Sequence, residues 1–289
     1  MIALLLAAIT LTGALSGAAT SSAEAADGKG PKTLLGSILG TSGRQDSHEE
    51  EERVDPDRPH FPEASTTVGK GRVVLESGYT FTEKRSSFSS HTYPEALLRV
   101  GMFAEWFEFR IGQSFLRQER TVAGTTTHES GAQDLYLGVK LALTEQAGYV
   151  PQIAVIPQMT VPTGSRDVTA GRVLPGVNVD LGWEIVKDLF DVELLIATNS
   201  VADNERTSHV EVATGLTAAL AVTRKLQTFV EWDAFYPTGS GAATGARHYA
   251  VGGLIYFITK NLAVDLRAGL GLNRQANDVI AGTGFAVRY

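Results

Sequence analysis

The sequence predicts an all-β protein, an antiparallel transmembrane β-barrel of about 12 strands. From residue 72 onward, apolar side chains recur at every second position over segments of about ten residues. The links between these segments alternate between short and long. No run after the first 25 residues reaches the roughly 18 continuous apolar residues that a membrane-spanning helix needs. A chain of this kind crosses a membrane as strands.

The first 25 residues have the features of an export signal. Residues 2–15 are nearly all apolar, and Ala23-Glu24-Ala25-Ala26 offers an Ala-x-Ala cleavage site after Ala25. A basic n-region is missing, so an uncleaved anchor is the alternative. We expect a signal peptide over residues 1–25 and a mature chain that begins near Ala26.

Residues 26–56 are expected to form a disordered polar tether. Most of the formal net charge of -7 comes from an acidic stretch in this region, and such runs resist packing by self-repulsion. The charge therefore gives no reason to expect a nucleic-acid partner. Residues 32–39 carry leucines and an isoleucine at helical spacing, which either a short amphipathic helix or incidental apolar residues in a tether would explain. The absence of cysteine excludes disulfides, a lipoprotein anchor and a thiolate site.

Residues 57–71 form a distinct pre-barrel segment. Its composition is not that of a flexible linker, because prolines, which restrict the backbone, flank Phe61. We expect this segment to pack at or in the periplasmic mouth of the barrel as a plug. There, Arg58 and Glu63 would meet charges of the lumen.

Residues 72–289 are expected to be the barrel. Nine segments alternate clearly, at residues 73–81, 107–115, 135–143, 177–183, 210–220, 228–236, 249–257, 262–272 and 285–289, and three weaker ones lie near 95–102, 152–160 and 190–198. Lipid offers no partner for a charge, so the apolar faces should look outward and the polar faces should line the lumen.

The links predict the orientation of the chain. Short links are expected at residues 103–105, 144–149, 186–189, 223–225 and 259–261, and long polar links at 82–92, 117–130, 162–174, 199–209, 237–247 and 273–280. Outer-membrane barrels have short periplasmic turns and longer outer loops. Both termini should therefore be periplasmic.

Charged residues on the polar faces are the lumen-lining candidates: Glu76, Arg99, Glu108, Arg110, Asp134, Lys140, Asp180, Glu184, Asp191, Glu193, Glu211, Glu231, Asp233, Asp265, Arg267 and Arg288. Acids outnumber bases. Rings of carboxylates would favour cations in a water-filled pore, whereas paired charges would fill the barrel with an internal salt-bridge network. Both interpretations remain open. The sequence shows no hydrolase or metal motif, so we expect no catalytic residue, metal or cofactor.

The pre-barrel segment resembles a known opening. The residues Asp57, Arg58, Pro59, Phe61 and Glu63 are similar to the start of the outer-membrane barrel family named after the meta-pathway of phenol degradation. His60 stands where that family usually has Asp, Ala64 separates Glu63 from Ser65, and Gly69 stands where Pro is usual.

Two further stretches resemble proteins of this kind. Val161-Pro162-Thr163-Gly164 is similar to a common Pro-Thr-Gly turn at the mouth of a long loop. The end of the chain, with Phe285, Val287 and Tyr289, resembles the signal that the barrel-assembly machinery reads.

The resemblance implies a transporter-like protein of the cell outer membrane, in a Gram-negative-type envelope. Its partners would be outer-membrane lipid, the barrel-assembly machinery and an unknown small-molecule solute. We expect a porin-like channel for passive passage of small solutes, with aromatic compounds as one class to consider. The alternative is a closed structural or adhesive barrel that binds partners through its outer loops, and a barrel enzyme comes third.

Overall fold

The computed structural model describes residues 31–40, 53–85, 87–203, 207–238 and 245–289. In these residues, one helix precedes fifteen strand segments: α1 (Leu34–Leu39), β1 (Val73–Lys84), β2 (Phe88–Thr92), β3 (Ala96–Gly101), β4 (Phe107–Gln113), β5 (Phe115–Val122), β6 (Thr125–Ala132), β7 (Leu135–Thr144), β8 (Gln152–Val161), β9 (Leu174–Val186), β10 (Phe190–Ala202), β11 (Ser208–Thr223), β12 (Leu226–Thr238), β13 (Arg247–Thr259), β14 (Leu262–Gly271) and β15 (Val279–Arg288). The predicted signal peptide, residues 1–25, lies outside the described residues, as does most of the expected tether.

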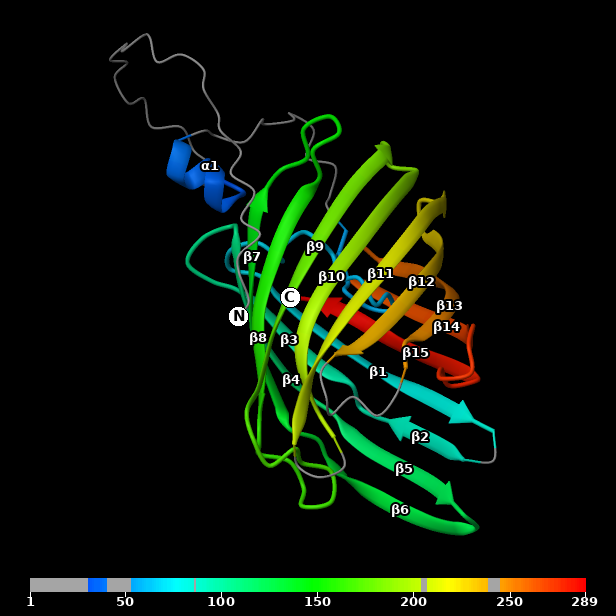
Figure 1. Cartoon of the computed structure of the whole chain (residues 1–289). Coiled ribbons are helices and arrows are strands. Elements are labelled where there is room, and N and C mark those ends of the chain that lie inside the picture. The colour runs from blue at the N-terminus through cyan, green and yellow to red at the C-terminus, as the bar shows by residue number, and fades with distance from the viewer. Residues whose placement is uncertain (1–30, 41–52, 86, 204–206, 239–244) are drawn as a thin grey trace, which may run out of the picture.

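The strand segments form one closed antiparallel sheet. They pair in the order β15-β14-β13-β12-β11-β10-β9-β8-β7-β4-β3-β1-β2-β5-β6, and β1 also pairs with β15, which closes the ring (Figure 1). Closure pairs the backbone groups that an open sheet would leave bare at its edges. The predicted all-β antiparallel barrel is confirmed.

The ring has twelve strands, because three of them are divided into two segments. β2 and β3 are halves of one strand that is interrupted at residues 93–95. Likewise, Ser114 separates β4 from β5, and residues 133–134 separate β6 from β7. These breaks are neighbours across the sheet, since Gln133 N donates to Ser114 O (2.8 Å). The expected number of strands is therefore correct.

Two of the six long links predicted from the sequence are largely strand. Residues 82–92 contain the end of β1 and all of β2, and residues 117–130 contain the β5–β6 hairpin. The hairpin turns at Ala123 and Gly124, whose φ angles of 50° and 82° suit a two-residue turn. The polar composition misled the prediction, because the threonines of this stretch are β-branched and favour strands.

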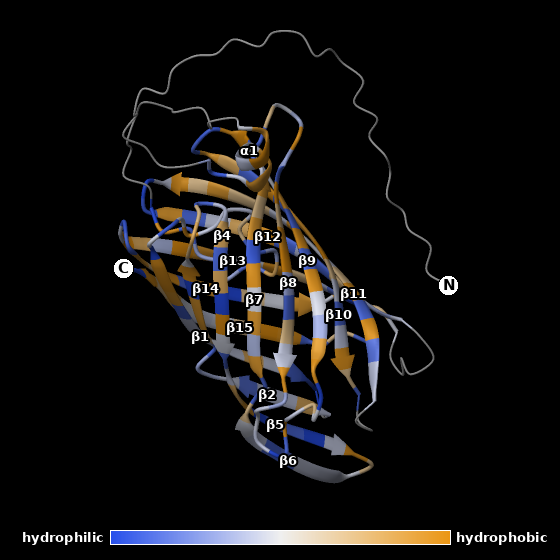
Figure 2. Cartoon of the chain, turned by 90° about the vertical axis from the view of Figure 1, so that its left-hand side faces the viewer, coloured by the Kyte–Doolittle hydropathy of each residue, from blue (hydrophilic) through white to orange (hydrophobic). Residues whose placement is uncertain are grey.

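The two faces of the wall differ in chemistry. On β7, Lys140 and Ala142 are buried toward the lumen, while Val139 and Leu141 alternate with them on the outer face. Figure 2 shows this alternation as orange and blue stripes along the strands. No helix of the described residues is long and apolar enough to cross a membrane.

The two ends of the barrel differ in their links. At one end, called here the short-turn end, the turns are residues 102–106, 145–151, 187–189, 224–225 and 260–261. At the other, the long-loop end, lie the β5–β6 hairpin, the links at residues 162–173 and 272–278, the ends of β1, β10 and β12 and the starts of β2, β11 and β13. The first strand begins and the last strand ends at the short-turn end, where Tyr289 N donates to Val73 O (2.8 Å).

The described parts of the expected tether are structured. Helix α1 is capped by Thr33, whose hydroxyl accepts from Gly36 N (3.2 Å), and by Gly40, whose φ is 67°. Val54 is 2% exposed, so packed chain is present by residue 53 rather than starting at residue 57. The chain is packed this early because Val54 contacts apolar side chains of the inner barrel wall. Residues 53–71 are called the lumen segment below.

Candidate functional site

The candidate site is the barrel lumen, which the lumen segment occupies next to the start of β1. Figure 1 shows this segment in blue between the front and back walls. Because the segment belongs to no strand, its backbone N–H groups need other partners. Wall carboxylates supply them: Asp57 N donates to Glu76 Oε1 (3.0 Å), Glu63 N to Asp180 Oδ1 (3.2 Å) and Val68 N to Glu108 Oε2 (2.9 Å).

Asp57 is the main ionic contact between the lumen segment and the wall. Arg110 Nη1 donates to Asp57 Oδ2 (2.7 Å), Lys140 Nζ donates to Asp57 Oδ1 (2.8 Å), and Arg99 Nε lies 3.3 Å from Oδ2. Burial alone would raise the pKa of the Asp57 carboxyl, but the charges of Arg99, Lys140 and Arg110 outweigh it and hold that pKa below its usual range. Asp57 is therefore ionised in the lumen.

Three cations on adjacent strands receive this carboxylate. We call Arg99 of β3, Arg110 of β4 and Lys140 of β7 the basic wall, and all three are at most 1% exposed. Two wall acids share them, since Arg99 Nε donates to Glu108 Oε1 (2.8 Å) and Arg99 Nη1 to Glu76 Oε1 (2.9 Å). A buried charge without a partner is costly, so the basic wall requires carboxylates close by.

The opposite side of the lumen carries acids. We call Asp180 of β9, Glu193 of β10, Glu231 and Asp233 of β12, and Asp265 of β14 the acidic wall. Glu231 Oε2 accepts from Phe61 N (3.1 Å), and Arg58 Nε lies 3.5 Å from Asp265 Oδ2. The lumen segment thus offers carboxylates to the basic wall and mainly N–H groups to the acidic wall.

Apolar contacts complete the fit of the lumen segment. Val54 and Val68 share a buried cluster with Phe257 and Ile255 of β13. Farther along the segment, the Phe61 ring lies 4.9 Å from that of Phe235. These contacts exclude water from the sides of the segment.

His60 is enclosed by the same walls. Its ring meets the Phe229 ring edge-on at 4.3 Å, and Nδ1 lies 3.7 Å from Glu193 Oε2. Burial, followed by the charge of Arg267, lowers the pKa of His60 from 6.5 to about 4. His60 is therefore neutral at neutral pH.

Wall glycines make room for the lumen segment. A Cβ built on Gly215 would lie 2.9 Å from Pro62 Cδ, and one built on Gly182 would lie 2.4 Å from Ser65 Oγ. On Gly78 a Cβ would meet the Arg58 guanidinium at 2.3 Å. These strand glycines are sites of close approach by the segment.

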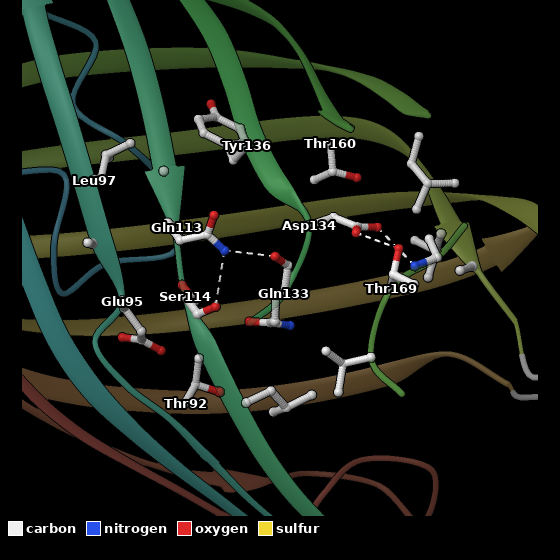
Figure 3. Close-up of a pocket in the computed structure, with 18 of the residues that line it drawn as sticks. Thr92, Glu95, Leu97, Gln113, Ser114, Gln133, Asp134, Tyr136, Thr160 and Thr169 are labelled. Carbon is white, nitrogen blue, oxygen red and sulfur yellow. Dashed lines mark hydrogen bonds between the residues drawn. The ribbon is translucent and has the colours of Figure 1, made fainter. Parts of the chain in front are cut away.

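A cavity of about 1020 Å³ lies above the lumen segment on the long-loop side. The lumen segment forms its floor through Asp57, Arg58, His60, Phe61 and Glu63. Its walls carry both polar and apolar side chains, including Leu97, Gln113, Gln133, Asp134, Tyr136, Thr160 and Thr169 (Figure 3). The cavity therefore leads from the long-loop end to a closed floor.

The loop at residues 162–173 shapes one side of this cavity. Asp134 Oδ1 accepts from Gly164 N (3.0 Å) and Thr169 Oγ1 (2.6 Å), and Asp134 Oδ2 accepts from Ala170 N (2.9 Å). Figure 3 shows Asp134 and Thr169 side by side at the edge of the cavity, with the hydrogen bond between them. The Asp134 carboxylate thus binds three positions of the loop that contains the predicted Pro-Thr-Gly turn, and Ser165 N adds a backbone hydrogen bond to Ala132 O (2.8 Å).

Comparison with known proteins identifies the family. The family model described as "Putative MetA-pathway of phenol degradation" matches residues 56–289. The chain belongs to this family. The match begins at residue 56, so it includes Asp57, Arg58 and Pro59 of the lumen segment as well as the whole barrel. A search of curated proteins finds no match.

One of the solved structures that this chain resembles, the first named here, supports the assignment of the fold. An outer-membrane channel from Pseudomonas putida F1 superposes with a TM-score of 0.65 at 12% identity, covering 79% of this chain and 99% of that one. The NanC porin matches with a TM-score of 0.48 at 12% identity, over 74% and 98% of the two chains. The CymD monoaromatic hydrocarbon channel matches with 0.45 at 8%, over 76% and 89%. The chain described in this structure therefore has the fold of an outer-membrane β-barrel.

Most of the predicted lumen residues contact the lumen segment. They are Glu76, Arg99, Glu108, Arg110, Lys140, Asp180, Glu193, Glu231, Asp265, Arg267 and Arg288. The family opening residues all belong to the lumen segment and lie next to these wall residues. They are Asp57, Arg58, Pro59, Phe61 and Glu63.

The remaining candidates have other positions. Asp134 holds the cavity loop, Glu211 pairs with Arg247 Nη2 (2.6 Å), Asp233 is buried next to Glu231, and Asp191 is half-buried. Glu184 lies on the same face of β9 as Asp180, beyond the packed part of the lumen. It is exposed at the short-turn end, where Oε1 accepts from Asp188 N (2.9 Å).

Sequence reasoning missed several residues of the site. Val54 and Val68 lie outside any apolar periodicity, and His60 departs from the family opening. Tyr136 donates to Gln158 Oε1 (2.9 Å) beside the cavity. The wall glycines were the available signal, because a Gly on the inner face of a strand indicates something close to the backbone.

Proposed function

We propose that the protein is a passive outer-membrane channel for small solutes that the lumen segment closes at rest. The observation that carries this proposal is the cavity of about 1020 Å³ whose floor is the lumen segment. The segment belongs to no strand and is held by ion pairs, side-chain hydrogen bonds and packing. It therefore acts as a removable plug, and passage requires it to move.

The open lumen would be wet and charged. When the lumen segment leaves, the basic wall loses Asp57 and the acidic wall loses the N–H groups of Phe61 and Glu63. Water replaces these partners in a pore of twelve strands, a size between filled barrels and wide porins. The salt-bridge interpretation of the lumen charges thus describes the closed state, and the cation-selective interpretation describes the open one.

We infer that both termini face the periplasm. The short-turn end holds the start of β1 and the end of β15, and outer-membrane barrels place short turns on the periplasmic side. The cavity would then open toward the cell exterior. Solutes would enter from outside and stop at the lumen segment.

The solute class follows from the family and the cavity lining. The family description names phenol degradation, and the cavity combines Tyr136, Leu97 and Leu116 with polar groups such as Asp134 and Gln133. Such a lining accommodates small solutes that carry both a ring and a polar group. Aromatic compounds are the first class to test.

The last strand is proposed to carry the assembly signal. Phe285 is 38% and Tyr289 77% exposed, and Val287 lies between them on the same face at the end of β15. Exposed aromatic side chains at this edge are accessible to the barrel-assembly machinery. Removal of Tyr289 should lower the folded yield in cells, whereas refolding in detergent should be unaffected.

The test of the channel is single-channel conductance of two matched deletions in planar bilayers. Deletion of residues 57–65 removes the centre of the lumen segment, and an equally long deletion of residues 41–49 leaves it intact. Folding is verified for both by a heat-dependent gel shift. The first deletion should conduct strongly and prefer cations, and the second should resemble the intact chain.

Other outcomes would favour the alternative functions of the barrel. A folded 57–65 deletion that stays silent would contradict the channel and favour a closed structural or adhesive barrel. We propose that the protein is not an enzyme; lipid hydrolysis that a single Ser or His substitution abolishes would contradict this.

A further inference from the structure

We propose that α1 is an interfacial helix that inserts its apolar face into the lipid leaflet at the short-turn end. The helix packs against β7, and Figures 1 and 2 both place it outside the barrel, beside the arrowhead of β7. The outer face of β7 at this end carries Leu141 and Leu143, which belong to the lipid-facing wall. The inference rests on the proposed membrane setting of the barrel.

One face of the helix is apolar and uncovered by protein. At 100° per residue, Leu34, Leu35, Ile38 and Leu39 fall within about 140° of the circumference. Leu35 is 43%, Ile38 68% and Leu39 72% exposed, and no residue of the helix is buried. Exposure of these three apolar side chains on one face to water would be unfavourable.

The surroundings of α1 mark the depth of the membrane boundary. Phe107 pairs with Leu141 of β7, and its ring lies 5.3 Å from Phe103 and 6.2 Å from Trp106. Aromatic groups of this kind favour the headgroup level of a bilayer. The β7–β8 turn adds Tyr149, which is 99% exposed.

The occupant of the apolar face is therefore phospholipid. A helix packed on a lipid-facing strand at the membrane boundary meets lipid with its apolar face and water with the side that carries Ser37. Its apolar face continues the outer surface of β7. Lys32 directly precedes the capped helix and is exposed, which suits the phosphate groups of the same leaflet.

The chain offers a clean experiment because it contains no cysteine. Single variants Ile38→Cys and Leu39→Cys, labelled with an environment-sensitive fluorophore, are refolded in phosphatidylcholine–phosphatidylglycerol vesicles. Ser37→Cys is the matched control, since Ser37 is exposed on the opposite side of the same helix. Leu266→Cys, on the outer face of β14 with Leu266 54% exposed, reports whether the barrel is in the bilayer.

We expect iodide to quench the labels at residues 38 and 39 at least about threefold less than the label at residue 37, and lipid nitroxides to quench them more. Equal iodide quenching at residues 37 and 38, with the residue 266 label quenched by lipid, would overturn the inference. A residue 266 label that lipid does not quench would instead contradict the membrane barrel itself. The two failures are therefore distinguishable.

Discussion

Lys140 and Asp57 lie 83 positions apart in the sequence, yet Nζ of the lysine is 2.8 Å from Oδ1 of the aspartate. The second acceptor of the same ammonium is Ala64 O, at 2.7 Å, which also belongs to the lumen segment. The charge balance of the barrel wall thus depends on whether the lumen segment is in place.

The Asp57→Asn variant should open the channel. It removes the negative charge that Arg110 and Lys140 share, and disruption of a buried ion pair costs about 3–5 kcal/mol. The open fraction, measured as single-channel current, should rise. The neighbouring Asp55→Asn provides the control, because the Asp55 carboxylate accepts from Thr66 Oγ1 within the lumen segment, whereas the ion pairs of Arg110 and Lys140 are made to Asp57. Identical currents in the two variants would contradict the proposal that the ion pairs of Asp57 hold the channel closed.

Acid should favour the open state through His60. A released segment has a histidine of ordinary pKa, 6.5, whereas burial and Arg267 lower the pKa of His60 to about 4 in the closed barrel. Between pH 6.5 and 4 the open state binds a proton that the closed state does not, so the closed state loses stability as the pH falls. The effect on the open-to-closed ratio is up to about tenfold per pH unit.

The His60→Gln variant isolates this contribution. Other titrating groups are shared by both proteins, so the difference between their conductance–pH curves reports on residue 60. The wild-type curve should rise more steeply between pH 6.5 and 4. Parallel curves would show that His60 stays neutral in both states.

Addition of one methyl group at Gly215 should displace the lumen segment. The new Cβ would lie 2.9 to 3.0 Å from the rings of Pro62 and Phe61, which cannot move as a flexible side chain can. Gly215→Ala should therefore raise conductance and lower the thermal midpoint of the gel shift. Gly252→Ala is the control, since its nearest neighbour, Phe229 O, lies at 3.4 Å. Equal effects at both sites would argue against close packing of the segment.

The orientation of the barrel can be tested on whole cells with single cysteines. Thr127 of β6 is exposed at the long-loop end and Tyr149 is exposed at the short-turn end. A membrane-impermeant maleimide should label Thr127→Cys in intact cells and Tyr149→Cys only after lysis. The reverse pattern would place the termini outside.

Alternation in the sequence was sufficient to predict the barrel and its number of strands. Because lipid surrounds the barrel and charged groups line its interior, apolar and polar side chains alternate along every strand. This alternation is visible in a single sequence. It was insufficient where polar residues form strands, as in the β5–β6 hairpin. Composition cannot distinguish a β-branched hairpin from a loop when neither face is apolar.

The site was less predictable because it depends on contacts distant in the chain. The charges of the lumen were visible as polar faces, and Asp57 and Arg58 were visible in the family opening. Their pairing was not, since the position of a segment without strand structure depends on the whole ring. Val54 and His60 illustrate this, because Val54 packs against side chains of β1, β13, β14 and β15, and His60 lies against Phe229 of β12 and Glu193 of β10.

The most direct test of the central claim is a reversible covalent lock on the lumen segment. A Cβ on Gly182 would lie 3.3 Å from Ser65 Cβ, close to the 3.5 to 4.5 Å or so that a disulfide spans. The double variant Ser65→Cys with Gly182→Cys, in the otherwise cysteine-free chain, is recorded in bilayers before and after reduction, with both single variants as controls. In recordings at pH 5, where the open state is favoured, a movable plug predicts no current in the oxidised form and channel openings after reduction. Equal currents in both forms, with the disulfide verified by mass, would contradict it.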